Sequence, residues 1–367
     1  MKQFCAFFVC GCILCSCTSN DKGCGQFKDV IVITDTVDDL APFISEVQVS
    51  LIDNSIVLSS ISKALVGENG ELYALNADGN LVSLTKDGKA GLVYSNRGRA
   101  SNEYISPLDI CLSDHYFSIL DVNKILSFKI GNPSDYKSIS FREGSYPYDA
   151  FAPSGDEGFF LFSAFSNSTR NDRKGAGNLL YLIDDKSNII QEYIPRNDCT
   201  FSLFNISQSR DNTYYLRPQD SESVFYELGD GTVKASYKID FEDKSMPSRY
   251  FYDKAGEDIG MYMLSEFNKL PMEFHDTKGY AYCRYCGPGA QEFSLVFNKQ
   301  SKKCITWMNQ NTDTDFRILC SDDDYFYMLP TANGVAHGPL ASIVNEKMKT
   351  LGCEDDQSAI VKIEFKF

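Results

Sequence analysis

Few residue groupings in this sequence have the spacing of a catalytic site, and the histidines give the clearest candidate. Only His115, His275 and His337 occur in the chain. His337 lies in a glycine-containing stretch, residues 333–339, where backbone without a side chain can approach a ligand closely. His115 begins an aromatic run and is expected in the core or at a rim. No Gly-x-Ser-x-Gly sequence, the turn that presents a nucleophilic serine, is present.

Acidic runs and cysteines point to two further chemistries, glycoside hydrolysis and thiol or metal chemistry. Acidic runs such as residues 184–185 and 322–324 could supply an acid and a base, but they lie in polar turns, where Asp is favoured for local hydrogen bonds. Cys283 and Cys286 have a redox spacing within an alternating strand pattern, in which residues three apart face opposite sides. No second pair of this kind and no HxxxH accompanies them. We predict inert thiols, no metal site and no cofactor.

Composition favours β-structure and argues against nucleic acid as a partner. The chain has 26 Phe and 21 Tyr against a single Trp, and aromatic residues favour strands. Its formal net charge is −15 and its pI is near 4.7, with no Lys or Arg cluster beyond short pairs. Such a charge repels a polyanion. We therefore predict an all-β protein that does not bind nucleic acid.

The first 17 residues have the pattern of an export signal. A positive start is followed by an uncharged apolar run, residues 4–14, and by small residues that end at Cys17. A run of about 11 residues is too short for a membrane-spanning helix, which needs about 20. The ending Leu-x-Ser-Cys resembles the bacterial lipobox, and this resemblance implies that Cys17 is lipidated. We divide the chain into a signal peptide (1–16), a lipidated tether with a candidate closing strand (17–40) and a folded domain (41–367).

Most of the folded domain consists of similar units. Each unit has a polar turn, a short aromatic-rich strand, a second turn and another strand. The mean interval of about 51 residues suits one four-stranded propeller blade with its loops. A blade cannot bury both faces alone, so blades stack around an axis. We predict a six-bladed β-propeller with short helical inserts, whose units begin near residues 69, 114, 156, 211, 278 and 322.

The two termini predict how the ring closes, and three segments interrupt the period, of which residues 163–177 are expected to be a polar loop. The alternating C-terminal strand, residues 360–367, needs a partner, and either residues 30–33 or residues 47–51 could supply it. Residues 245–276 have helical spacing around Met263 and are expected to be an insert with one short helix. Residues 331–357 contain a second amphipathic pattern that ends at Gly352.

The junction between the first two units contains a recognisable motif. Gly98, Arg99, Glu103, Tyr104 and Pro107 match a G-[RK]-G-P-G-E-[YF]-x-x-P pattern, whose central Gly-Pro-Gly is replaced here by Ala-Ser-Asn. The chain thereby resembles the six-bladed, NHL-like β-propeller lipoproteins of Bacteroidetes. This resemblance implies a propeller in the cell envelope, and no particular reaction. The residue after Cys17 lacks the Asp that resembles an inner-membrane retention signal, which favours an outer-membrane lipoprotein.

Two functions remain open at this point. The first is a non-catalytic binding or scaffold module that uses a propeller face for a glycan, a peptide or an envelope protein. The alternative is a lyase or hydrolase acting on a carbohydrate-like substrate at the channel mouth, where propellers collect polar residues from several blades. Because no catalytic constellation is apparent, binding is the expected function. The candidate ligand contacts are Arg99, Glu103, Arg284 and His337.

Overall fold

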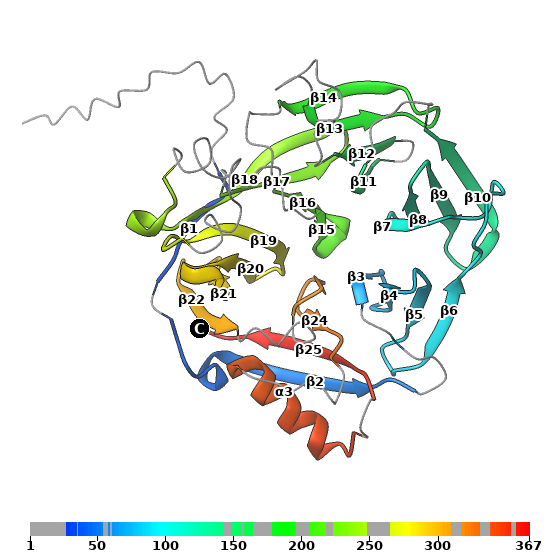
Figure 1. Cartoon of the computed structure of the whole chain (residues 1–367). Coiled ribbons are helices and arrows are strands. Elements are labelled where there is room, and N and C mark those ends of the chain that lie inside the picture. The colour runs from blue at the N-terminus through cyan, green and yellow to red at the C-terminus, as the bar shows by residue number, and fades with distance from the viewer. Residues whose placement is uncertain are drawn as a thin grey trace, which may run out of the picture.

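The described strands form six sheets arranged in a ring around a central axis (Figure 1). Five sheets have four strands and one has five, so the six-bladed β-propeller is confirmed. A single α-helix occurs among the residues that the structure describes. The structure is a computed structural model, and it describes residues 27–34, 36–53, 58, 61–141, 148–155, 158–163, 178–195, 206–217, 223–247, 265–309, 317–330, 338–353 and 357–367.

Each blade is an antiparallel sheet whose first strand lies nearest the axis, where the first strands of different blades contact one another. Blade 1 contains β3 (Ile61–Val66), β4 (Leu72–Asn76), β5 (Leu81–Leu84) and β6 (Ala90–Tyr94). Blade 2 contains β7 (Pro107–Leu112), β8 (Tyr116–Asp121), β9 (Lys124–Lys129) and β10 (Asn132–Ser140). Blade 3 contains β11 (Ala150–Ser154), β12 (Gly158–Phe162), β13 (Asn178–Ile183) and β14 (Ile189–Pro195).

The second half of the ring consists of blades 4 to 6, and blade 6 includes strands from both ends of the folded domain. Blade 4 contains β15 (Ile206–Gln208), β16 (Tyr214–Leu216), β17 (Val224–Gly229) and β18 (Thr232–Asp240). Blade 5 contains β19 (Lys269–Asp276), β20 (Tyr280–Cys286), β21 (Glu292–Asn298) and β22 (Cys304–Asn309). Blade 6 contains β23 (Cys320–Ser321), β24 (Phe326–Met328), β25 (Ala359–Phe365) and, as its outermost strand, β2 (Ile44–Leu51).

The ring is closed by the second of the two predicted partners. β2 pairs antiparallel with β25, from Ile44 opposite Phe365 to Leu51 opposite Ala359. The other candidate segment does not take part in closure. β1 (Asp29–Val32) instead adds to blade 4 as a fifth strand, parallel to β18.

Apolar and aromatic side chains fill the space between neighbouring blades. Buried clusters lie between blades 1 and 2, across blades 2 to 4, between blades 4 and 5, between blades 5 and 6, and between blades 6 and 1. Trp307 is 1% exposed and packs in the cluster between blades 5 and 6. Because both faces of every blade are covered in this way, the middle strands have few exposed positions.

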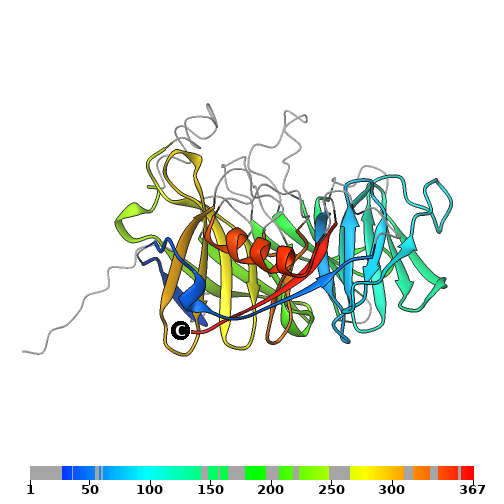
Figure 2. The same cartoon turned by 90° about the horizontal axis from the view of Figure 1, so that it is seen from below.

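Two of the three predicted interruptions, residues 245–276 and 331–357, have different outcomes, and residues 164–177 of the remaining one lie outside the described residues. The second pattern forms α3 (Pro339–Thr350), which lies on the outer side of blade 6 against β2 (Figure 2). Gly352 follows it with φ +72°, as suits a helix end. The prediction of an insert over residues 245–276 was wrong in part, because these residues include the strand β19. Shifts of register on both sides of Met272 break its alternation, which hid it as a strand. The helix expected around Met263 lies outside the described residues.

The proposed signal and lipid-attachment residues, which include Cys17, also lie outside the described residues. Within the described ranges, no helix combines the length and apolar character needed to cross a membrane.

Candidate functional site

The turns that join the first and second strands of the blades gather around one end of the axis. Three adjoining hollows of about 200, 340 and 690 Å³ open between these turns. They lie between blades 1 and 2, among blades 1, 4 and 6, and across blades 2 to 4, respectively. Asn212, in the turn of blade 4, lines all three. We call the residues that line these hollows the mouth.

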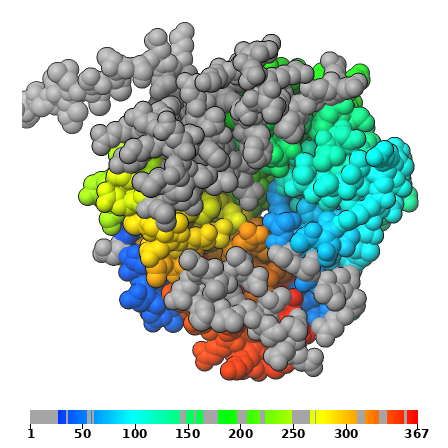
Figure 3. All heavy atoms as spheres, in the orientation of Figure 1, coloured from blue at the N-terminus to red at the C-terminus, as the bar shows by residue number. Residues whose placement is uncertain are grey.

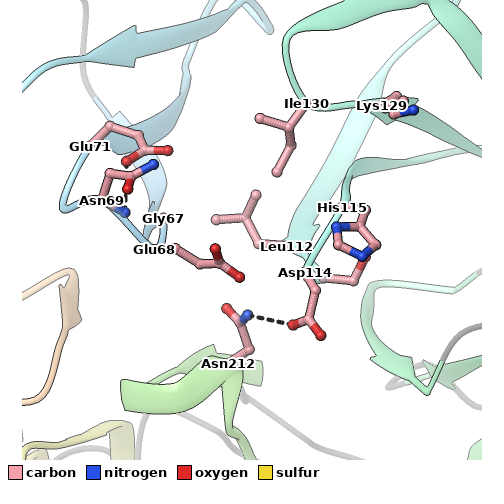
Figure 4. Close-up of a pocket in the computed structure, with 11 residues that line it drawn as sticks. Gly67, Glu68, Asn69, Glu71, Leu112, Asp114, His115, Lys129, Ile130 and Asn212 are labelled. Carbon is pink, nitrogen blue, oxygen red and sulfur yellow. Dashed lines mark hydrogen bonds between the residues drawn. The ribbon is translucent and has the colours of Figure 1, made fainter.

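The smallest hollow brings polar side chains from three blades together (Figure 4). Glu68 of blade 1, Asp114 of blade 2 and Asn212 of blade 4 point toward a shared space, with Leu112 between them. The Asn212 side-chain amide donates to Asp114 Oδ1 at 3.3 Å. His115, which was expected in the core or at a rim, is exposed and lies beside Asp114 at the mouth.

The second hollow contains a cation among several carboxylates. Arg210 lies 3.1 Å from Asp211 and 3.8 Å from both Asp276 and Asp323. Asp323 also pairs with Lys278 at 2.5 Å. Arg210 thus links the turn of blade 4 to blades 5 and 6. Its position is fixed by a tight turn in which Asp211 and Asn212 both have positive φ, 53° and 51°.

The largest hollow is lined mainly by acidic and small polar residues. Carboxylates come from blade 2, as Asp114, and from blade 4, as Asp211, Glu227 and Asp230. The cation in this hollow, Lys137, has its ammonium 5.0 Å above the ring of Tyr116. Carboxylates therefore outnumber cations along its wall, which favours cationic ligands over anionic ones.

A glutamine closes the axis beneath the mouth. Gln208 of β15 is 2% exposed, and its Oε1 accepts the backbone N–H of Val66 in blade 1 at 3.1 Å. Its amide also donates to Asn212 Oδ1 at 2.7 Å. Blades 1 and 4 are opposite one another in a six-bladed ring, so this contact spans the axis. Gln208 therefore bridges the axis directly beneath the mouth.

The opposite end of the inner strands contains partly buried ion pairs. Glu273 lies 3.0 Å from Arg284 and 3.3 Å from Arg317, and Arg317 also donates to the carbonyl of Ile61 in blade 1 at 2.9 Å. The backbone of Glu273 has φ +32°, which is strained for a residue with a side chain. Burial would lower the pKa of Arg284, but Glu273 raises it above its usual range. We call this network the braced end.

A second pair at the axis joins three blades. Lys63 of β3 lies 2.5 Å from Asp109 of β7, whose other oxygen accepts the N–H of Phe151 in β11 at 2.9 Å. Burial raises the pKa of Asp109, and the ammonium of Lys63 opposes this shift. Through this arrangement Asp109 connects β3, β7 and β11.

The structure does not bring the predicted ligand contacts to one site. Arg99 is exposed at the junction between blades 1 and 2, and Arg284 belongs to the braced end of blade 5. Glu103 acts locally, because its carboxylate accepts the N–H of Ala100 at 2.8 Å. Their grouping at a channel mouth is thus not seen, and His337 lies outside the described residues.

The junction motif has a structural explanation. A Cβ on Gly98 would lie 1.9 Å from Glu103 Oε2, so glycine is needed for the carboxylate to fold over the loop. Tyr104 is fully buried, and its hydroxyl donates to the carbonyl of Gly79 in blade 1 at 2.7 Å. These residues fix the path from one blade to the next.

The cysteine pair lies in blade 5 as two buried thiols. Cys283 and Cys286 are both free, and burial raises the pKa of both, for Cys286 to about 11. A thiol with a raised pKa is a poor nucleophile near neutral pH. Among the described residues, no group of His, Cys, Asp and Glu has an arrangement that could hold a metal ion.

The mouth residues were not identified from sequence as ligand contacts. Asp211 and Asn212 were visible only as turn residues at the start of the fourth unit. A usable signal existed in the repeat itself, because the equivalent turn of every blade reaches the same end of the axis. Polar residues at these equivalent turns are therefore neighbours in space although about 51 residues separate them in sequence.

Comparisons with known proteins agree with the architecture. A crystal structure of a Bacteroides fragilis protein, named as exported, has a TM-score of 0.72 at 14% identity and covers 92% of this chain and 100% of that one. A catalytically inactive virginiamycin B lyase from Staphylococcus aureus, crystallised with quinupristin, has a TM-score of 0.44 at 11% identity over 86% of this chain and 99% of that one. At 14% identity, the likeness to the Bacteroides fragilis protein shows the fold alone. No curated protein matches the sequence.

The family is shown by sequence over most of the chain. Residues 54–327 match the family DUF5128, described as a 6-bladed beta-propeller. This match begins just after β2 and ends in β24, so it takes in five complete blades. The protein belongs to the DUF5128 family of 6-bladed beta-propellers.

Proposed function

We propose that this protein is a non-catalytic binding module of the cell envelope, anchored by lipid at Cys17, whose mouth holds a positively charged segment of a partner protein. The observation that carries the proposal is the set of three adjoining hollows shared by several blades. A ligand that enters them can contact several rigid turns at once, which gives specificity without a moving element.

The charge of the mouth supports a cationic ligand. Carboxylates line it from blades 1, 2, 4 and 6, namely Glu68, Glu71, Asp114, Asp211, Glu227, Asp230 and the run 322–324. Lysine or arginine side chains of a partner would find complementary charge there, and the net charge of −15 would speed their approach. A neutral glycan is the alternative ligand, and the titration described below distinguishes it from a basic peptide.

A channel-mouth lyase or hydrolase has no comparable support. The candidate contacts Arg99, Glu103 and Arg284 are dispersed, and Gln208 closes the axis in the described part of the protein. The location in the envelope is supported by the export-signal pattern and the lipobox-like ending at Cys17.

Calorimetric titration tests the ligand class. A Lys/Arg-rich decapeptide, its Asp/Glu-rich counterpart and a neutral oligosaccharide are titrated at low and high salt. We expect binding of the basic peptide alone, weakened by salt. Asp114→Asn with Asp211→Asn should reduce affinity several-fold, whereas Asp87→Asn, an exposed carboxylate of the β5–β6 turn outside the mouth, should not. Binding of the acidic peptide or the oligosaccharide instead would overturn the proposed ligand.

The anchor has a separate test. Radiolabelled palmitate should be incorporated into the full chain expressed in a Gram-negative bacterium, and Cys17→Ser should abolish labelling and release the protein from membranes. A labelled Cys17→Ser variant would contradict lipidation at this residue.

A further inference from the structure

The chain segment before the closing strand lies along the outer edge of the ring. We call residues 28–40 the N-terminal arm, of which residue 35 is not described. In Figure 1 this segment runs from β1 beside β18, past β22, to the start of β2. Figure 3 shows its blue atoms against the yellow atoms of blade 5.

The arm is first attached to blade 4. β1 pairs in parallel with residues 237–240 of β18, and flanking backbone bonds join Lys28 to Ser236 at 2.7 Å and Ile33 to Asp240 at 3.2 Å. Ile31 is fully buried in the cluster between blades 4 and 5. The Lys28 ammonium also pairs with a carboxylate of β17. The strand is therefore held by backbone, apolar and charged contacts together.

The same arm then crosses to blade 5. Thr34 donates its hydroxyl to the carbonyl of Cys304, and the N–H of Val37 donates to the carbonyl of Thr306 at 2.7 Å. Thr36 forms a parallel bridge with Thr306. Leu40 is fully buried in the cluster between blades 5 and 6. Contacts to two blades thus precede the closing strand along the chain.

The path continues through β2 onto blade 1. Beyond β2, the N–H of Asp53 donates to the carbonyl of Gly88 in the β5–β6 turn at 2.9 Å. A Cβ on Gly88 would lie 1.9 Å from the carbonyl oxygen of Leu51, so the two segments are in direct contact. One continuous stretch of chain therefore touches blades 4, 5, 6 and 1.

We propose that the N-terminal arm is a strain-relief clamp, which protects ring closure from tension applied through the N-terminal tether. The inference rests on the tether of the proposed function, because only a protein held at its N-terminus would receive such tension. Pulling at residue 28 meets β1 first, then the contacts with β22, then Leu40. β2, the strand that closes the ring, is loaded only after these attachments have separated.

The order of these contacts matters more than their individual strength. Without the arm, tension would act directly on the pairing of β2 with β25, and loss of that pairing opens the ring and exposes strand edges. With the arm, a transient pull can peel β1 and be reversed while the ring stays closed. Blades 1 to 3 would keep their geometry throughout, and blade 4 would lose only its added fifth strand, β1.

Single-molecule pulling on the purified full chain tests the clamp. One handle is attached at Asn132, an exposed residue at the start of β10, and the other at either Asn20 or Asp38, each replaced by an azide-bearing residue. Position 20 pulls through the arm, whereas position 38 lies after β1 and after the contacts with β22, so it bypasses most of the arm and leaves β1 unaltered. Ile31→Asp loosens the arm, and Val30→Asp places the same charge on the exposed side of the same strand as a matched control.

From position 20 we expect a short first transition, with a length gain of about 35 Å for about ten extended residues, before the ring opens. From position 38 this transition should be absent. When the chain is pulled from position 20, Ile31→Asp should lower the force of the short transition, and Val30→Asp should leave that force unchanged. Ring opening from position 20 without a preceding short transition, at the force needed from position 38, would overturn the clamp. The comparison between handle positions 20 and 38 tests the clamp even if the Ile31→Asp variant does not fold. The pulling experiment involves neither lipid nor ligand, so its result does not depend on whether the proposed binding or the proposed anchoring is correct.

Discussion

The two ends of the inner strands both carry many charges, but they place them in different environments. At the braced end, Glu273 and Arg284 are about one-tenth exposed and contact each other directly. At the mouth, Asp114 and Asp211 are exposed, and each has few partners. The difference suggests that one end holds the blades together and the other remains available to a ligand.

Physical chemistry explains why the same residue types can serve these two ends. A buried ion pair gives little net stability relative to apolar packing, yet removing one partner leaves an uncompensated buried charge. An exposed carboxylate is solvated whether or not it has a partner, so its loss has little effect on folding. Substitutions at the two ends should therefore separate stability from binding.

The largest effect is expected for Glu273→Ala at the braced end. It leaves Arg284 and Arg317 without their shared carboxylate and should lower the free energy of unfolding by about 3 kcal/mol. Urea titration followed by far-ultraviolet circular dichroism measures this. Glu46→Ala, on the exposed side of β2, is the control and should change stability little. A loss below about 1 kcal/mol for Glu273→Ala would mean that the network does not brace the ring.

A smaller loss is expected where the axis is closed. Gln208→Leu keeps the side-chain volume but leaves the N–H of Val66 without its acceptor, which should reduce stability by about 1 to 3 kcal/mol. Gln48→Leu makes the same change on an exposed strand position and should be close to neutral. The two urea midpoints are compared directly. Equal midpoints would show that the contact across the axis is dispensable.

The fold could be predicted mainly from the middle strands of the blades. β8 and β20, for example, are rich in aromatic and apolar residues and are followed by clear turns. The inner strands were harder to find because they are short or irregular: β23 has two residues, and β19 contains two register shifts. Their pairing depends on contacts with distant blades, which local sequence does not reveal.

The candidate site was less predictable than the fold for the same reason. Gln208 looks like an ordinary polar residue until the ring places it opposite Val66. Arg284 was predicted as a candidate ligand contact, whereas in the structure it contacts Glu273, whose strained backbone has no sequence signature. Turn positions could have been compared between units, which would have grouped Asp114 with Asp211.

We expect the loss of folding stability at acid pH to originate from His275, which lies between the braced end and the mouth. His275 is 2% exposed; burial lowers its pKa, Arg284 acts in the same direction, and Glu273 and Asp276 oppose the shift. The unfolded chain then binds a proton at higher pH than the folded protein does. Stability from neutral His275 is full above the ordinary histidine pKa of about 6.5 and is lost as the pH falls below it.

Urea midpoints measured between pH 7.5 and pH 5.5 test this linkage. His275→Gln should flatten the decline that the unmodified protein shows, whereas His115→Gln, at an exposed mouth position, should retain it. An unchanged decline in the His275 variant would assign acid sensitivity to other groups.

The smallest effect on stability is expected at the mouth, and it sharpens the comparison most. Asp114→Asn removes a charge but keeps an oxygen that can accept from the Asn212 amide, so stability should change by less than about 0.5 kcal/mol. The same variant should weaken binding of a basic peptide, measured by calorimetry at low salt. Loss of binding with unchanged stability would mark the mouth as a surface whose carboxylates are dispensable for folding. If Asp114→Asn instead destabilised the protein as much as Glu273→Ala, both ends would have to be regarded as braces. The ligand would then have to be sought on another face of the ring.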